Sequence, residues 1–248
     1  MSSAPAASPD AAPEVGTLAR ISGVFFSPQQ TFDSIARRPS WILPVIFLCL
    51  VSCGVTAAFG SRVGWRVFMQ KQLESSSRVQ QLPPEKQEQI IDQQTKLAPA
   101  IGYIFGTVGS FIFVLIAAGV LFAVFNYFMG TKVSFGATVG IVAHSWLPYV
   151  IAGLLGILVI FLKDPSTVDL RNLIASNPGA FLSDDAPKWL LSLLTSLDIF
   201  TLWVLILQGI GFHAANPKKM TISKAFFTVL AVFILFTLVK VGIVAAFS

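Results

Sequence analysis

The sequence has little charge for its length. Charged side chains make up 12% of its 248 residues, whereas hydrophobic side chains make up 54%. Average proteins carry about 25% charged residues, so this chain lacks the charged surface that a soluble fold of its size needs. That shortage excludes an ordinary cytosolic enzyme, a disordered protein and a disulfide-stapled secreted domain. It leaves a polytopic membrane protein.

Cysteine and histidine are also scarce. Cys49 and Cys53 lie one helical turn apart in the first apolar run, where we interpret them as small packing residues. His144 and His213 are far apart in sequence and no cysteine accompanies either, so we predict no metal site. The sequence has no P-loop, GxSxG or HExxH motif. We therefore predict no enzyme, no catalytic residue and no cofactor.

Long uncharged stretches predict an all-α fold, a bundle of five transmembrane helices. A spanning helix needs about 20 apolar residues, and in lipid its backbone polar groups are satisfied within the helix. The alternating strands of a membrane barrel are absent from the sequence. We take residues 18–248 as one transmembrane domain and residues 1–17 as a disordered tail rich in Ala, Pro and Ser. The predicted spans are about 41–60, 103–129, 138–162, 189–212 and 224–247.

The basic residues set the predicted orientation. The net charge is +5, but the basic residues stand between apolar runs, which favours lipid head groups over nucleic acid. The raw count of basic residues does not favour a cytoplasmic N-terminus, because residues 61–99 alone carry six. Arg37 and Arg38 immediately precede the first span, and Lys218 and Lys219 occupy a short loop without an acid. We therefore predict a cytoplasmic N-terminus and a C-terminus outside, most simply in a bacterial inner (plasma) membrane.

A short amphipathic helix is predicted before the first span. Ser27 is the expected N-cap, Pro28 the first helical residue, and Gln30 the partner in a capping box. Phe32 shares a face with Ile35 and Ala36, and Arg37 and Arg38 close the helix before Pro39. Two interpretations stay open: a simple stop before the span, or a specific docking element.

Two extramembrane loops carry some apolar residues. In residues 61–99, Pro83-Pro84 opens a Gln-rich helical stretch that we expect to cover the mouth of the bundle. Residues 163–188 contain turn residues and two short apolar patches, so we expect this loop to fold back onto the membrane surface.

Two charges stand inside predicted spans. An ionised Asp or Lys at the centre of a span costs about 2.5–3.5 kcal/mol on insertion scales. Asp198 and Lys240 fall at nearly the same depth in antiparallel neighbouring spans, toward the outer leaflet. Three interpretations compete: a structural ion pair, separate snorkelling of Lys240 to the outer surface, and a proton or ion pathway.

Two neutral polar residues are candidates for contacts between helices. Asn126 in the second span is a plausible interhelical hydrogen-bond donor. His144 lies in the segment AHSWLPYV, where a lone histidine is typical of a hydrogen-bonded interface residue. Pro148 is expected to kink the third span. Gly102-Gly106 and Gly136-Gly140 have GxxxG spacing, which permits close helix contact.

Four sequence segments resemble a known family. They are SPQQTFDSIARRPSWILP before the first span, LRNLIASNPGAFL, LTSLDIFTLWVLILQGIGF in the fourth span, and TISKAFFTVLAVFILFTLVKVG in the fifth. Together they resemble the bacterial-type branch of the Yip family, the Ypt/Rab-interacting membrane proteins, over about residues 18–248. The resemblance implies five spans, a cytoplasmic N-terminus and no known catalytic activity. Eukaryotic relatives are linked to Rab GTPases and vesicle traffic, a role that bacteria have no machinery for.

Two functional hypotheses follow. The first is a non-enzymatic scaffold or adaptor whose partners are the lipid bilayer and another membrane protein or a second copy of the chain. The second is a transport or channel component that uses Asp198, Lys240 and Asn126 as intramembrane polar groups. A continuous hydrated cavity past Asp198 would favour transport, whereas a closed bundle would favour the scaffold.

Overall fold

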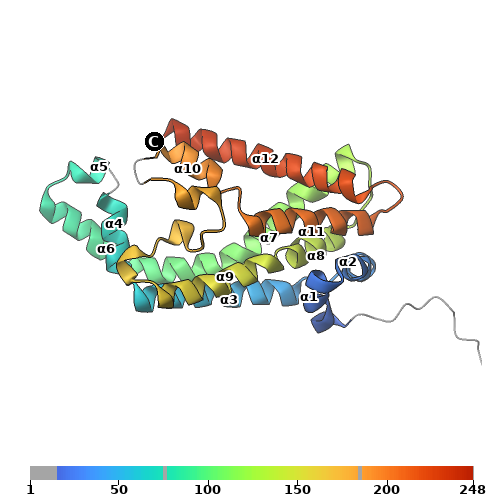
Figure 1. Ribbon diagram of the computed structural model, residues 1–248, viewed down its shortest axis with the longest axis horizontal. Helices are drawn as coiled ribbons and strands as arrows, with labels where there is room; N and C mark the ends of the chain where they lie inside the picture. Colours follow the sequence, from blue (N-terminus) through green and yellow to red (C-terminus); the bar gives the residue numbers. More distant parts are fainter. Residues whose placement is uncertain (1–15, 75–76, 184–185, 248) are drawn as a thin grey trace, which may run out of the picture.

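The computed structural model describes residues 16–74, 77–183 and 186–247, and over these residues it contains helices and loops but no strand. The long helices run side by side along one axis (Figure 1). The short helices at the start of the chain lie at one end, which we call the inner end. The opposite, outer end carries the C-terminus and an arm formed by the segment between the first two spans.

The spanning and connecting helices follow the apolar pattern of the sequence. They are α1 (Thr17–Phe26), α2 (Pro28–Arg37), α3 (Ile42–Arg62), α4 (Trp65–Glu74), α5 (Ser77–Gln80), α6 (Pro84–Ile104), α7 (Ser110–Ala123), α8 (Phe135–Ser145), α9 (Leu147–Leu162), α10 (Lys188–Leu194), α11 (Ile199–Ala215) and α12 (Ile222–Ala246). Two π-helical segments follow α6 and α7: η1 (Phe105–Gly109) and η2 (Val124–Phe128). Three 3-10 helices lie between α9 and α10: η3 (Pro165–Thr167), η4 (Leu170–Asn172) and η5 (Pro178–Phe181).

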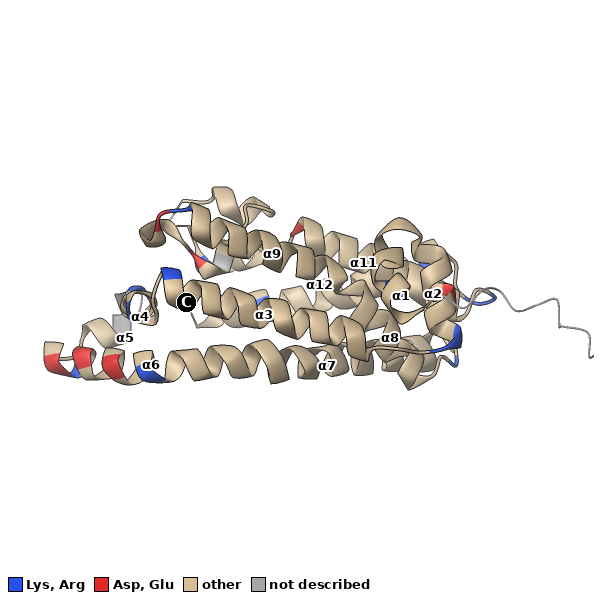
Figure 2. Cartoon of the chain, turned by 90° about the horizontal axis from the view of Figure 1, so that it is seen from below, with Lys and Arg blue, Asp and Glu red and all other residues tan. Residues whose placement is uncertain are grey.

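The predicted membrane bundle is confirmed. Among the described residues, four helical stretches are long and apolar enough to cross a membrane: Ile42–Arg62, Pro84–Phe128, Phe135–Leu162 and Ile222–Ala246. The third is interrupted at Trp146, because Pro148 sits in the first turn of α9. Most charged residues gather toward the two ends of the molecule, and few stand between them (Figure 2).

The fourth predicted span differs from the single helix expected over 189–212. It consists of α10 and α11, which are bent by 48° at a short break. The break follows from local chemistry, since the hydroxyls of Thr195 and Ser196 bond back to the carbonyls of Leu191 and Ser192. Asp198 then starts a new helix as its N-cap. The result is a discontinuous span.

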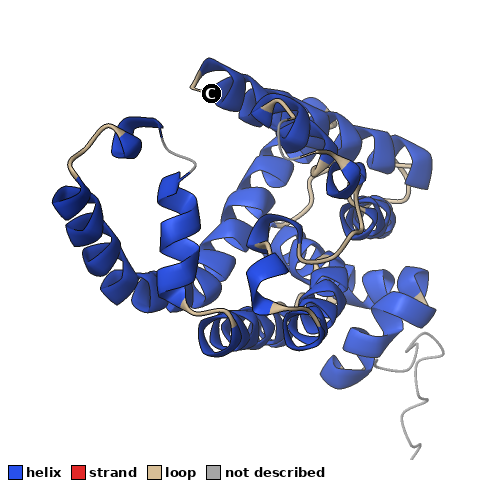
Figure 3. Ribbon diagram, turned by 60° about the vertical axis from the view of Figure 1, so that its left-hand side comes forward, coloured by secondary structure: helices blue, strands red, loops and turns tan. Residues whose placement is uncertain are grey.

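The Gln-rich stretch does not cover the mouth of the bundle as expected. It forms the first part of α6, which continues through η1 and α7 as one helical stretch over Pro84–Phe128. This stretch projects past the outer end, where α4 packs against it to form the arm seen in Figure 3. The exposed Arg66 on α4 pairs with Glu88 and Asp92 on α6, and its hydrogen bond with Asp92 is the main cause that raises the pKa of Arg66.

The largest apolar core lies toward the inner end, where α2, α7, α8 and α11 meet. Phe125 and Phe212 stack there with ring centroids 3.8 Å apart. A second, smaller core at the outer end joins α3, α9 and the loop after α9 through residues such as Phe59, Ile160 and Val168. By contrast, α12 packs mainly on α10 and α11 at the edge of the bundle.

Candidate functional site

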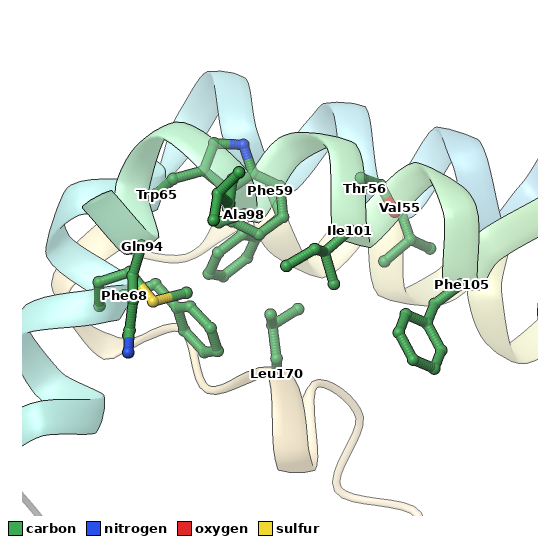
Figure 4. Close-up of a pocket in the computed structure, with 13 residues that line it drawn as sticks. Val55, Thr56, Phe59, Trp65, Phe68, Gln94, Ala98, Ile101, Phe105 and Leu170 are labelled. Carbon is green, nitrogen blue, oxygen red and sulfur yellow. The ribbon is translucent and has the colours of Figure 1, made fainter. Parts of the chain in front are cut away.

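An apolar cavity of about 500 Å³ lies at the outer end. The end of α3, the helix α4 and the middle of α6 enclose it, and Leu170 reaches it from the loop after α9 (Figure 4). No Asp, Glu, Lys, Arg or His lines it, and its polar lining residues are Thr56 and Gln94. Such a lining suits an apolar ligand, because it offers dispersion contacts and few polar partners. Its 13 residues are Val55, Thr56, Phe59, Trp65, Phe68, Met69, Gln94, Leu97, Ala98, Ile101, Gly102, Phe105 and Leu170.

Glycines let Trp65 form one wall of this cavity. A Cβ added to Gly60 would lie 2.6 Å from Nε1 of Trp65, and one added to Gly102 would lie 3.2 Å from its ring. Phe59 stacks edge-to-face on Trp65, with ring centroids 5.5 Å apart. Gly102 also contacts Thr56 on α3, and the next glycine of its GxxxG pair, Gly106, contacts Ser52. The spacing therefore holds α6 and η1 close against α3, as expected for such pairs.

A second cavity, of about 360 Å³, lies deeper in the bundle between α3, α7 and the start of α9. Val55 lines both cavities, so they adjoin along α3. Two of the polar groups in the second cavity are bonded within the protein: Ser110 donates to the Gly106 carbonyl, and the Tyr149 hydroxyl lies 3.2 Å from Thr201 Oγ1. Its lining comprises Leu48, Val51, Ser52, Val55, Ser110, Phe113, Trp146, Tyr149, Val150 and Gly153.

Asp198 and Lys240 both lie near the break in the fourth span, but they bond to different groups. Asp198 accepts hydrogen bonds from the backbone N–H groups of Phe200 (2.8 Å) and Thr201 (3.2 Å), and from the Ser176 hydroxyl. Lys240 donates to the hydroxyl of Ser196, 2.5 Å away and two residues before Asp198. The ion pairs found in the described part of the chain do not join these two side chains. Neither residue lines the two cavities described above.

Asn126 and His144 bond locally rather than across distant helices. The amide of Asn126 donates to the Val133 carbonyl at 2.9 Å and accepts from the Val133 N–H at 2.7 Å. These bonds close the turn between α7 and α8, in which Gly130 and Lys132 have positive φ angles of 63° and 60°. His144 is fully buried, and its Nδ1 lies 2.8 Å from the Gly140 carbonyl of its own helix.

The pre-span helix α2 docks on the bundle. Pro28 starts the helix and Arg37 ends it, with Arg38 as C-cap. Ser27 occupies the N-cap position, but its side chain makes no capping bond, so the expected capping box does not form. Phe32 and Ile35 are fully buried. Their partners include glycines on other helices, since a Cβ on Gly211 would lie 3.0 Å from Phe32 and one on Gly140 would lie 3.0 Å from Ile35.

Sequence reasoning missed α1 and its buried arginine. Arg20 Nη1 donates to the Arg38 carbonyl and to Ser40 Oγ, both at 2.8 Å, and so ties α1 to the linker between α2 and α3. Burial lowers the pKa of the Arg20 guanidinium below its usual range, although an arginine stays charged. The spacing of Leu18, Ile21 and Phe25, three and four residues apart, is typical of one helix face. No sequence feature identifies the carbonyl that Arg20 binds.

Within residues 16–74, 77–183 and 186–247, no group of three or more His, Cys, Asp or Glu is placed to hold a metal ion. A family model for the Yip1 domain matches residues 22–243. The chain belongs to the Yip1 family. No curated protein and no solved structure matches it.

The Yip1 domain includes nearly all of the described structure. Its match takes in both cavities, the broken span and the docked helix α2. The family resemblance expected from the sequence is thereby confirmed at the level of the Yip1 domain. The Yip family is not a known enzyme family. The cavities of this Yip1 domain are candidate binding sites.

We expect Asp198 and Lys240 of the Yip1 domain to be energetically coupled. Opposite charges near one break attract each other strongly where little water screens them. Asp198→Asn and Lys240→Met should each lower the free energy of unfolding in mixed micelles. The double variant should recover about 1 kcal/mol, a modest value because unfolded chains in the membrane also find polar partners.

The matched control pairs Asp198→Asn with Lys224→Met at the opposite end of α12. Distant sites add within about 0.3–0.5 kcal/mol, so this second cycle should show no coupling. If the losses in free energy of unfolding were additive in the Asp198/Lys240 cycle as well as in the control cycle, Lys240 would reach water independently of Asp198.

Proposed function

We propose that this Yip1-domain protein is a non-enzymatic membrane scaffold or adaptor that binds lipid or another membrane protein through its helices. The observation that carries the proposal is the outer-end cavity, which has an apolar lining without a charged residue. A site of this chemistry can retain an apolar chain or an apolar side chain. It holds no acid–base pair with which to transform a ligand.

The polar contacts of Asp198, Lys240 and Asn126 favour this proposal over a transport role. Each of the three side chains has protein partners, and those partners stabilise a helix break or a turn. A transport path would need polar groups that face a shared cavity. The two cavities described are lined instead mainly by apolar residues, and Ser110 and Tyr149 in the second cavity have bonding partners within the protein.

Co-purification tests the scaffold proposal. The full chain is extracted from native membranes in a mild detergent, and native mass spectrometry reports what stays bound. Ile101 lines the cavity, whereas Ile104 stands one turn further along α6, is similarly exposed and lies outside the cavity. We expect a retained lipid or membrane protein, lost from Ile101→Trp and kept by Ile104→Trp. If the unsubstituted protein retained neither lipid nor another protein, the proposal would be refuted.

We further propose that the protein belongs to the bacterial-type branch of the family and lies in the bacterial inner membrane, with its N-terminus in the cytoplasm. Arg37, next to the first span, and the loop lysines Lys218 and Lys219 support this orientation. All three lie at the inner end, opposite the arm of α4 and α6.

Cysteine labelling tests the orientation. In a chain with Cys49 and Cys53 replaced by Ala, a membrane-impermeant maleimide should label Lys86→Cys on the arm of intact cells. Lys218→Cys should react only after the membrane is permeabilised. The reverse pattern would place the N-terminus outside.

A further inference from the structure

The two cavities share Val55 and both lie along α3, and together we call them the trough. Leu48, Val51, Val55 and Phe59 recur every three or four residues, so they share one face of this helix. Val55 belongs to both linings and marks the point where the cavities adjoin. From Leu48 to Phe59 the trough extends about 16 Å, at about 1.5 Å per helical residue. An extended hydrocarbon chain fits such a shape better than a compact ligand does.

Most walls of the trough lie in uncharged runs of the chain. On α6 and α7 all but Gln94 follow Lys96, and on α3 they fall before Arg62. The residues of α4 lie beyond these runs, at the outer mouth. The hydroxyls of Thr56 and Ser110 are turned to carbonyls of their own helices, at 3.0 and 2.7 Å. A polar ligand would therefore lose its water without gaining equivalent partners, which is costly. The occupant that suits this lining is apolar.

The outer mouth of the trough has the opposite character. Arg62 ends α3 beside the mouth and is exposed. Its charge acts on Asp164, at the start of the loop after α9. Lys71, at the end of α4, donates to the Ser166 carbonyl of the same loop. Trp65 lines the cavity at this level, the depth at which tryptophan favours the membrane interface. Charges of both signs above an apolar trough match the order of groups in a glycerophospholipid.

We infer that the trough holds one acyl chain of an outer-leaflet glycerophospholipid, whose phosphate lies at the Arg62 end. This inference rests on the proposed function and names the partner that the cavity binds. The chain enters between Trp65 and Ile101, passes Val55, and ends near Trp146. The occupant is thus a lipid and not a helix of another protein, because an apolar lining below a charged mouth follows the order of groups in a phospholipid.

Fluorescence quenching by a brominated lipid tests the depth of the chain. The protein keeps Trp146 as its one tryptophan, with Trp41, Trp65, Trp189 and Trp203 replaced by Phe. It is titrated in detergent with phosphatidylcholine brominated near the end of its acyl chain. We expect quenching of Trp146 that saturates at about one lipid per protein. Val55→Phe, which blocks the junction, should raise the lipid concentration for half-quenching about tenfold, a difference of about 1.4 kcal/mol.

Leu50→Phe is the matched control, since Leu50 lies on α3 but is exposed outside both linings. It should shift half-quenching less than about twofold. Native mass spectrometry of the chain with all five tryptophans gives a second measurement, in which the unsubstituted protein and Leu50→Phe retain one phospholipid and Val55→Phe does not. Unsaturable quenching that Val55→Phe leaves unchanged would overturn the inference. If the chain retained another protein but no lipid, the lipid inference would be overturned and the proposed function would stand. If the chain retained neither, both the inference and the proposed function would be refuted.

Discussion

Phe32→Ala should release the N-terminal helices from the bundle, with a loss of about 3 kcal/mol in the free energy of unfolding. The Phe32 side chain is fully buried on α2, within the main core. Removing a buried phenyl ring costs about 3–5 kcal/mol, because dispersion contacts are lost and a cavity remains. We expect the lower part of this range, since α2 can detach while the spans stay folded. Hydrogen exchange measured peptide by peptide should show faster exchange over α1 and α2.

Phe26→Ala is the control for this variant. Phe26 lies on the neighbouring α1 and is 85% exposed, so its loss should change the free energy of unfolding by less than about 0.5 kcal/mol. If both variants left hydrogen exchange in α2 unchanged, α2 would not be a docked element. The simpler interpretation, a stop before the first span, would then hold.

Gly209→Leu should separate α12 from α11 and cost about 3 kcal/mol. A Cβ at position 209 would lie 2.9, 3.0 and 3.1 Å from Cβ, Cα and N of Phe226. Two of these are backbone atoms, which cannot turn aside as a side-chain end can, so the helices must move apart. Overpacking typically costs about 1–3 kcal/mol, and the upper value applies because α12 packs mainly on α10 and α11.

Gly242→Leu provides the comparison on α12 itself. A Cβ at Gly242 meets no atom within 4 Å, and leucine favours helix formation over glycine by up to about 1 kcal/mol. This variant should therefore be neutral or slightly stabilising in mixed-micelle unfolding. Equal losses from both substitutions would indicate a general intolerance of bulk in these spans and not a specific contact between α11 and α12.

Hydropathy predicted the spans well because long uncharged runs have few other solutions in a membrane. It did not predict the break in the fourth span. The sequence predicts Asp198 as an intramembrane charge. Its role as N-cap depends on the hydrogen bonds that its carboxylate accepts from the N–H groups that follow it. Its further partner, Ser176, is 22 residues away in sequence. Composition alone counts a charge and cannot tell a helix cap from an ion-pathway residue.

The buried face of α2 was predictable from the spacing of Phe32 and Ile35, but the surface that receives it was not. That surface depends on glycines at positions 140 and 211, which look unremarkable within apolar helices. The cavity was likewise hidden, because it arises where Trp65 packs over Gly60 and Gly102 and leaves space beside α3. Such a space is a property of side-chain packing between helices, for which a single sequence carries no periodic signal.

The most direct test of the account is a cryo-electron microscopy structure of the full chain in a nanodisc of native phospholipids. The account predicts elongated density along the trough, from the Arg62 end past Val55 to Trp146, with no covalent link to the protein. It also predicts that this density disappears in Val55→Phe while the helices keep their positions. A trough closed by the protein's own side chains, or filled by a helix of another chain, would contradict the lipid-binding account.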